Sequence, residues 1–321
     1  MTLILSSSPH AHDRVSVSGL MLDVLIALLP ALGCAVYFFG PRALLLTATC
    51  IASCLVTEAL CRLAMKRSNT LGDLSAVVTG LLLALNLPPT LPLWMAMLGG
   101  VFAIGVAKQV FGGLGYNPFN PALAARAFLL ISFSGAMTTW TPSLWHATVD
   151  AATTATPLAT LKTLADAHAL TNVSFMRAAF LGNINGCLGE VSSAALLLGA
   201  AYLLIRRVIT WHIPAAFLGT MALFAFVRYG LDLNALKLAE VHVLCGGAIL
   251  GACFMATDYV TSPATPLGKM IFGCGCGLLT MLIRLYGSFP EGASFAILVM
   301  NAFTPLISRF TQPKPFGGAA K

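Results

Sequence analysis

Charged side chains are scarce in this sequence of 321 residues, of which only 9% are Asp, Glu, Lys or Arg. A soluble globular domain carries roughly a quarter, so a soluble fold of this size could not cover its surface with so few charges. The formal net charge is +7, but no aromatic-rich basic face accompanies it, and we expect no nucleic-acid partner. The scarcity of charge favours a protein surrounded by membrane lipid.

Motifs that would make the chain a complete enzyme are also missing. The sequence has no GxGxxG fingerprint, no GxxxxGK[ST] phosphate loop, no HExxH and no paired CxxC. Eight of the nine cysteines lie in or beside apolar segments, where a thiol is a small hydrophobic group. Cys274 and Cys276 could in principle hold a metal, but the glycines around them favour close helix packing. We therefore predict no catalytic residue and no metal site.

Long hydrophobic runs, in contrast, fill most of the chain. A spanning helix needs roughly 20 apolar residues, so we predict an all-α integral membrane protein with about ten transmembrane helices. The third run is short and ends at two prolines, which indicates a broken or partly spanning helix. The runs lie near 20–39, 43–61, 74–87, 91–111, 121–135, 189–205, 211–228, 241–257, 266–283 and 292–308.

The basic residues predict how the helices are oriented. With the N-terminus in the cytoplasm and the runs alternating, twelve of the 18 lysines and arginines fall at cytoplasmic ends. Because these residues favour that side, we predict cytoplasmic N- and C-termini. The chain would then have a membrane half over 1–135, a long outer loop over 136–188 and a second membrane half over 189–321.

The two halves share a faint pattern that suggests a repeat. Residues 80–128 and 247–303 each pass from an apolar helix through a proline break to a second helix. Five helices per half would give two inverted five-helix repeats, which are common in secondary transporters. A secondary transporter or channel without a covalent cofactor is therefore the alternative function.

A few charged residues fall within the apolar runs. Asp23 and Glu58 lie deep enough to be candidates for an ion or proton path. For Lys108, Lys269 and Arg284 we expect positions at the membrane interface, with the charged head reaching water.

The outer loop contains the most informative segment, Asp150-Ala-Ala-Thr-Thr-Ala-Thr156-Pro-Leu158. Read alone, it is a hydroxyl-rich linker or a helix start, with Thr154 or Thr156 as the cap before Pro157. A long loop of this kind is often functional.

This segment resembles the flavin-attachment motif of a family of redox-complex subunits. The family comprises the D subunit of the Rnf electron-transport complex and the B subunit of the sodium-translocating NADH:quinone reductase. Its pattern is an acidic residue, small residues, Ser or Thr, a small residue and then Ala-Thr. The resemblance implies FMN joined to Thr156 through a phosphoester, with Asp150, Thr153, Thr154 and Ala155 completing the motif. Thr154 stands where the family often has Gly.

Four more segments resemble the family in the same order. They are Ser8-Pro9-His10, the stretch 112–122 (GGLGYNPFNPA), the stretch 254–258 (FMATD) and the stretch 290–301 (PEGASFAILVMN). The shorter chain favours the Rnf D subunit over the longer sodium-pump subunit. The stretch 112–122 could bind a second flavin, pack against a neighbouring subunit, or form a tight turn between two helices.

Taken as a whole, the resemblance implies an electron-transfer subunit in a bacterial inner membrane, with the flavin loop in the periplasm. Electrons would pass through FMN to or from partner subunits that carry flavins and iron–sulfur clusters. The complex would couple ferredoxin and NAD chemistry to Na⁺ or H⁺ transport. A flavin transferase would attach the FMN, and a noncovalent riboflavin is compatible with the family. A scaffold subunit that has lost its flavin is a third interpretation.

Overall fold

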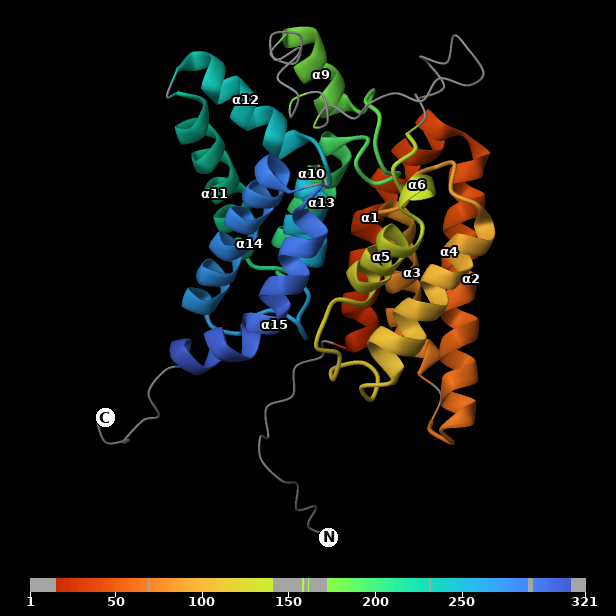
Figure 1. Ribbon diagram of the computed structural model, residues 1–321. Coiled ribbons are helices and arrows are strands. Elements are labelled where there is room, and N and C mark those ends of the chain that lie inside the picture. Colours follow the sequence, from red (N-terminus) through yellow and green to blue (C-terminus); the bar gives the residue numbers. More distant parts are fainter. Residues whose placement is uncertain are drawn as a thin grey trace, which may run out of the picture.

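The computed structural model describes residues 16–68, 70–140, 158, 161, 172–230, 232–287 and 291–312. Every regular element within these residues is a helix, and they contain no strand (Figure 1). The predicted all-α class is confirmed.

The N-terminal half forms a group of helices joined by short connections. Its short helical turns are η1 (Leu71–Asp73) and α6 (Ser134–Met137). Its longer elements are α1 (Val17–Phe39), α2 (Pro41–Ala64), α3 (Ser75–Leu85), α4 (Leu93–Val101), the π-helix η2 (Phe102–Gln109) and α5 (Pro121–Ser132).

The C-terminal half begins after the surface helix α9 (Val173–Leu181). Gly246 and Gly247, with φ of 71° and 66°, separate α12 from α13 and bend this pair by 62°. The elements are α10 (Ser193–Ile205), α11 (His212–Tyr229), α12 (Leu233–Leu244), α13 (Ala248–Leu250), the π-helix η3 (Gly251–Met255), α14 (Pro266–Tyr286) and α15 (Ala293–Thr311).

Local sequence explains several helix boundaries. The side chain of Ser16 accepts a hydrogen bond from a first-turn N–H and so caps α1. Gly40, at φ 75°, ends α1, and Pro41 follows as the first residue of α2. Asn120 caps α5 in the same way as Ser16 caps α1, immediately before Pro121.

The helices are apolar enough for a membrane. Five of them have the length and hydropathy to cross one, and the bent pair α12–α13–η3 would be a sixth. Four further apolar helices have 10–17 residues: α3, α4 with η2, α5 and α10. The structure therefore supports an integral membrane protein, with five or six candidate spans defined by length and hydropathy.

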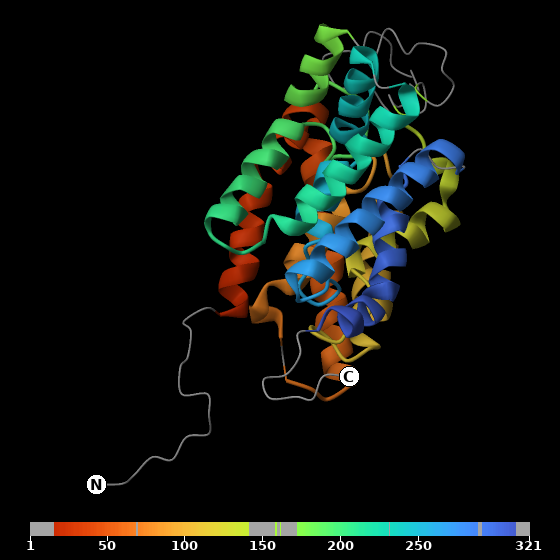
Figure 2. The ribbon, with the colours of Figure 1, turned by 90° about the vertical axis from the view of Figure 1, so that its left-hand side faces the viewer.

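The two halves lie side by side. α1 packs on α10, while α2 contacts α3 and α4, and α11 contacts α12 and α14. Figure 2 shows α1 (red) and α10 (green) next to each other along one side of the bundle. α1 begins and α15 ends at the same end of the bundle, here called the terminal end, and α9 lies at the opposite end, the α9 end (Figure 1).

Glycines allow the closest helix contacts. A Cβ atom added to Gly199 of α10 would overlap the carbonyl oxygen of Ala27 on α1. One added to Gly277 of α14 would likewise overlap the carbonyl oxygen of Phe217 on α11. Small residues at such contacts are how helices pack when lipid removes the hydrophobic drive between them.

Candidate functional site

A glycine-rich turn between η2 and α5 forms one wall of a cavity among the described residues. Gly112, Gly113 and Gly115 have φ of 120°, 102° and 93°, values that favour glycine. The turn brings Leu114, Asn117 and Asn120 to the cavity. The tight-turn interpretation of this segment is thus correct, and the turn also faces a pocket.

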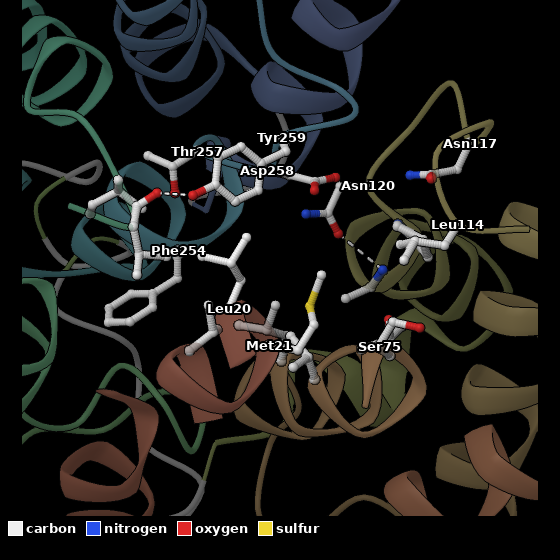
Figure 3. A pocket seen from close by; sticks show the side chains of 18 of the residues that line it. Leu20, Met21, Ser75, Leu114, Asn117, Asn120, Phe254, Thr257, Asp258 and Tyr259 are labelled. Carbon is white, nitrogen blue, oxygen red and sulfur yellow. Dashed lines mark hydrogen bonds between the residues drawn. The ribbon is translucent and has the colours of Figure 1, made fainter. Parts of the chain in front are cut away.

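This inner pocket lies between the two halves and encloses about 820 Å³ of empty space, its mouth included. Its walls come from α1, the start of α3, η2, the glycine-rich turn, the end of α10 and the end of η3 (Figure 3). The lining residues are Leu20, Met21, Val24, Ser75, Val78, Thr79, Leu82, Lys108, Leu114, Asn117, Asn120, Pro121, Ala122, Leu203, Val208, Ile209, Phe254, Thr257, Asp258 and Tyr259.

Polar groups gather along one edge of the inner pocket. Asn120 and Asp258 lie close together at the upper edge in Figure 3, opposite the apolar side chains of Leu20 and Met21. Asn120 Nδ2 donates to the backbone oxygen of Met255 at 3.2 Å and so ties the turn to the end of η3. Burial raises the pKa of Asp258 above its usual range. The pocket therefore has apolar walls with a few convergent polar groups, which is typical of cofactor sites.

A buried ion pair adjoins this pocket. Lys108 Nζ lies 3.2 Å from both carboxylate oxygens of Glu58 and donates to Ser75 Oγ at 2.6 Å. Glu58 also accepts hydrogen bonds from Thr70 at 2.9 Å and Gln109 at 3.0 Å. The prediction that Lys108 reaches the membrane interface is wrong, because its side chain is only 2% exposed. The π-helical widening of η2 places it inside the bundle, where Glu58 compensates its charge.

Asp23, the other predicted ion-path residue, is held elsewhere in the bundle. Tyr202 donates to Asp23 Oδ1 at 2.9 Å and Arg206 donates to Oδ2 at 3.2 Å. Tyr202 lies on α10 and Arg206 at its end, so this contact joins α1 to α10. Arg206 is 57% exposed, which makes this pair much more open than Lys108–Glu58.

A second buried charge cluster lies toward the α9 end, between the halves. Arg126 of α5 is hydrogen-bonded to Glu291 and to Asn86 Oδ1 at 2.8 Å. It also lies 3.6 Å from Glu190 Oε1 and 3.5 Å from Cys187 Sγ. We call Arg126, Glu190 and Glu291 the outer cluster.

Two hydrogen-bond acceptors of the outer cluster are unused. Glu190 Oε1 and Glu291 Oε1 are buried and have no hydrogen-bond partner. Burial, and next the Glu190 carboxylate, raise the pKa of Glu291 above its usual range, although Arg126 opposes the rise. Cys187, Glu190 and Glu291 are close enough to surround a metal ion. However, the Arg126 guanidinium already contacts all three side chains, which argues against a cation among them.

Arg284 of α14 lies beside the outer cluster, at the bend between α12 and α13. Its guanidinium donates to the backbone oxygens of His242, Cys245 and Gly246 and holds the bend between α12 and α13. The prediction that it reaches the interface is wrong, since it is 3% exposed. The bend leaves backbone carbonyls without helical partners, and an arginine can satisfy several of them at once. Lys269, by contrast, is partly exposed and binds Thr210.

The predicted flavin-attachment residues Asp150, Thr153, Thr154, Ala155 and Thr156 lie outside the described residues. The structure does place the two leucines that follow them, Leu158 and Leu161, which are 4% and 2% exposed. Both belong to an apolar cluster near the α9 end together with Ala179, Ile184, Leu238, Val241 and Cys245.

Sequence reasoning missed the outer cluster. Glu190 follows a glycine-containing loop rather than an apolar run, so the search for charges within the apolar runs does not reach it. The one available signal was Glu291 within the stretch 290–301. Its partners lie far away in the sequence, so no local pattern identifies them.

Comparisons with known proteins identify the family to which this chain is similar. The profile of the NQR2, RnfD, RnfE family matches residues 4–317. The D subunit of the Na⁺-translocating ferredoxin:NAD⁺ oxidoreductase complex of Acetobacterium woodii is 48% identical over 317 residues, covering 99% of this chain and 96% of the relative. The proton-translocating counterpart of Clostridium ljungdahlii is 44% identical over 317 residues, covering 98% and 96%. The D subunit of an ion-translocating oxidoreductase complex of Escherichia coli is 37% identical over 348 residues, covering 99% of both chains.

Proposed function

The chain belongs to the NQR2, RnfD, RnfE family, and on this premise we propose that it is the D-type membrane subunit of an ion-translocating ferredoxin:NAD oxidoreductase complex. The observation that carries the proposal is identity of 48% and 44% to two such subunits over nearly the whole chain. One of these relatives is named for Na⁺ and the other for protons. Other membrane and peripheral subunits, with flavins and iron–sulfur clusters, would be its partners.

FMN is the proposed covalent cofactor, attached by a transferase to Thr156. The support is the motif from Asp150 to Thr156, which has an acidic residue, two adjacent threonines and Ala-Thr in the family order. A threonine hydroxyl is a weak nucleophile at neutral pH, so a separate enzyme must activate the attachment. The flavin would supply one- and two-electron transfer, while the protein supplies position and electrostatics.

We also propose a second, noncovalent flavin, such as riboflavin, for the inner pocket. The support is chemical: apolar walls with a few convergent polar groups are typical of cofactor sites. The apolar side chains of Leu20, Met21 and Phe254 can pack on a planar ring, while Asn117 and Asp258 line the same pocket with groups that can bind ring or ribityl polar atoms. The lining residues include no positively charged cluster that could bind a diphosphate. Their one lysine, Lys108, is already paired with Glu58.

The membrane path of the ion would use the buried carboxylates. Glu58 and Asp23 stay our candidates because both are buried and each is shared between two helices or turns. We propose that the four shorter apolar helices complete about ten spans, arranged as two inverted five-helix sets with cytoplasmic termini and the flavin loop in the periplasm. The support is that the packing of α2 on α3 and α4 is matched by that of α11 on α12 and α14.

In-gel flavin fluorescence tests the covalent cofactor. The chain is expressed with its transferase, denatured and compared with Thr156→Ala. We expect a fluorescent wild-type band, a dark Thr156→Ala band and a fluorescent band for the control Thr154→Gly, which introduces the residue common in the family. A dark wild-type band, with the transferase active on another substrate, would refute the flavin-carrier proposal and favour a transporter or a bare scaffold.

A further inference from the structure

Leu158 and Leu161 are the described residues that follow the proposed flavin threonine most closely, two and five positions after Thr156. Both side chains are buried. Their apolar neighbours come from α9, α12 and the break after α12, with Ala179, Val241 and Cys245 each 1% exposed or less. These two side chains are therefore packed against the helices at the α9 end.

Leu158 also borders the outer cluster. It lines a small cavity of about 250 Å³ of empty space together with Glu190, Glu291, Cys245 and Gly246. A Cβ atom at Gly246 would overlap Leu158 Cδ1, so the leucine sits directly on this turn. The carbonyl oxygen of Gly246 in turn accepts a hydrogen bond from Arg284 at 2.9 Å.

We propose that Leu158 and Leu161 are an anchor that docks the flavin-bearing segment on α12 and the Gly246 turn, and so holds the flavin beside the outer cluster. The flavin part of this inference rests on the proposed function. A link of two residues spans at most about 7 Å, so a group carried by Thr156 is tethered close to Leu158. The leucines act as positioning residues, because they hold the segment and need not touch the flavin.

The anchor explains two features that otherwise have no role. Leu158 and Leu161 are buried, although they belong to a stretch, 150–163, that otherwise consists mainly of small and hydroxyl residues. The turn below them carries glycine at a positive φ, where any larger residue would displace Leu158. An electron carrier on a loop needs such a fixed point, since a mobile carrier is held at the reacting distance for only part of the time.

Cysteine chemistry on the flavinylated protein in membranes tests the docking. In a Cys274→Ser background, which removes the exposed native thiol, Leu158→Cys should resist a water-soluble maleimide. The control Leu181→Cys, on α9 and 52% exposed, should react quickly. Under mild oxidation Leu158→Cys should form a disulfide with the native Cys245, identified by peptide mass, and a Cys245→Ser change should abolish it. Labelling of Leu158→Cys as fast as the control, without a disulfide, would overturn the anchor.

The positioning role is tested by Leu158→Ala beside the conservative Leu158→Met. Both should keep in-gel flavin fluorescence, which shows that attachment is intact. In Leu158→Ala, iodide quenching of the native flavin should rise severalfold and electron transfer to it should slow, while Leu158→Met restores both. Unchanged quenching and rate in Leu158→Ala would overturn the positioning role. A dark wild-type band would instead refute the covalent flavin, and the maleimide result would still decide the docking.

Discussion

At the terminal end of the bundle, Glu58 meets a single cation, and both of its carboxylate oxygens are hydrogen-bonded. Toward the α9 end, Arg126 is shared by Glu190 and Glu291, and one oxygen of each carboxylate has no hydrogen-bond partner. The first arrangement borders a pocket of about 820 Å³ and the second a cavity of about 250 Å³. The difference is that the ion pair at the terminal end borders the larger of these two cavities, whereas the outer cluster at the α9 end joins the two halves through charge.

Both arrangements connect segments that would otherwise be independent. Lys108 and Glu58 belong to the same half, whereas Arg126 and Glu291 belong to different halves. A buried charge is costly unless it is paired. Removing one partner should therefore damage the α9 end more, because there the loss strands two carboxylates and also loosens the contact between halves.

Arg126→Met should have the largest effect. It leaves Glu190 and Glu291 without their shared cation, and breaking a buried pair costs about 3–5 kcal/mol of stability. We expect a large fall in the thermal denaturation midpoint in detergent, or loss of folded protein from the membrane. The double variant Arg126→Met with Glu291→Gln should recover part of the loss.

A matched control is Arg228→Met, at an exposed position near the end of α11. Its effect on the midpoint should be small. An equal fall of the denaturation midpoint in Arg126→Met and Arg228→Met would show that the outer cluster does not join the halves.

Lys108→Met should have a smaller effect than Arg126→Met. Glu58 would lose its cation but keep the hydrogen bonds from Thr70 and Gln109. We therefore expect the free energy of unfolding to fall by about 3 kcal/mol, the lower end of the range for a broken buried pair. The same change borders the inner pocket and should also weaken retention of a noncovalent flavin. The measurement is the denaturation midpoint together with the flavin content of the purified protein.

A loss for Lys108→Met as large as that for Arg126→Met would contradict the proposed difference between the two ends. Lys269→Met is the control, because Lys269 is a partly exposed lysine bonded only to Thr210 among the described contacts. It should leave both the midpoint and the flavin content nearly unchanged.

Much of the fold follows from local sequence, and its exceptions have local causes. The short third run was predicted from the prolines at its end, and α3 does end at Leu85. The run 241–257 was predicted as one helix but bends by 62°, because Gly246 and Gly247 adopt positive φ. Sequence shows these glycines but not the Arg284 side chain that binds the freed carbonyls. The bend is therefore a tertiary effect.

The site was harder to predict than the fold. Depth in an apolar run correctly indicated that Asp23 and Glu58 are buried. Their partners could not be found in this way, since Lys108 lies 50 positions from Glu58, and Glu291 lies 165 positions from Arg126. The attachment motif at Thr156 came from family resemblance, and it stays a prediction.

Arg206→Gln should have the smallest effect on the denaturation midpoint. It tests whether burial of a charged pair, rather than its position at one end of the bundle, determines how far the midpoint falls. Asp23 lies in the second turn of α1, which begins at the terminal end, and its partner Arg206 is 57% exposed. Solvent and salt screen such a pair, and Tyr202 still donates to Asp23. We expect no measurable change in the denaturation midpoint at moderate salt, and a small decrease that appears only at low salt. A loss comparable to that of Lys108→Met would mean that the contact between α1 and α10 depends on this pair, and that exposure does not separate structural charges from the others in this protein.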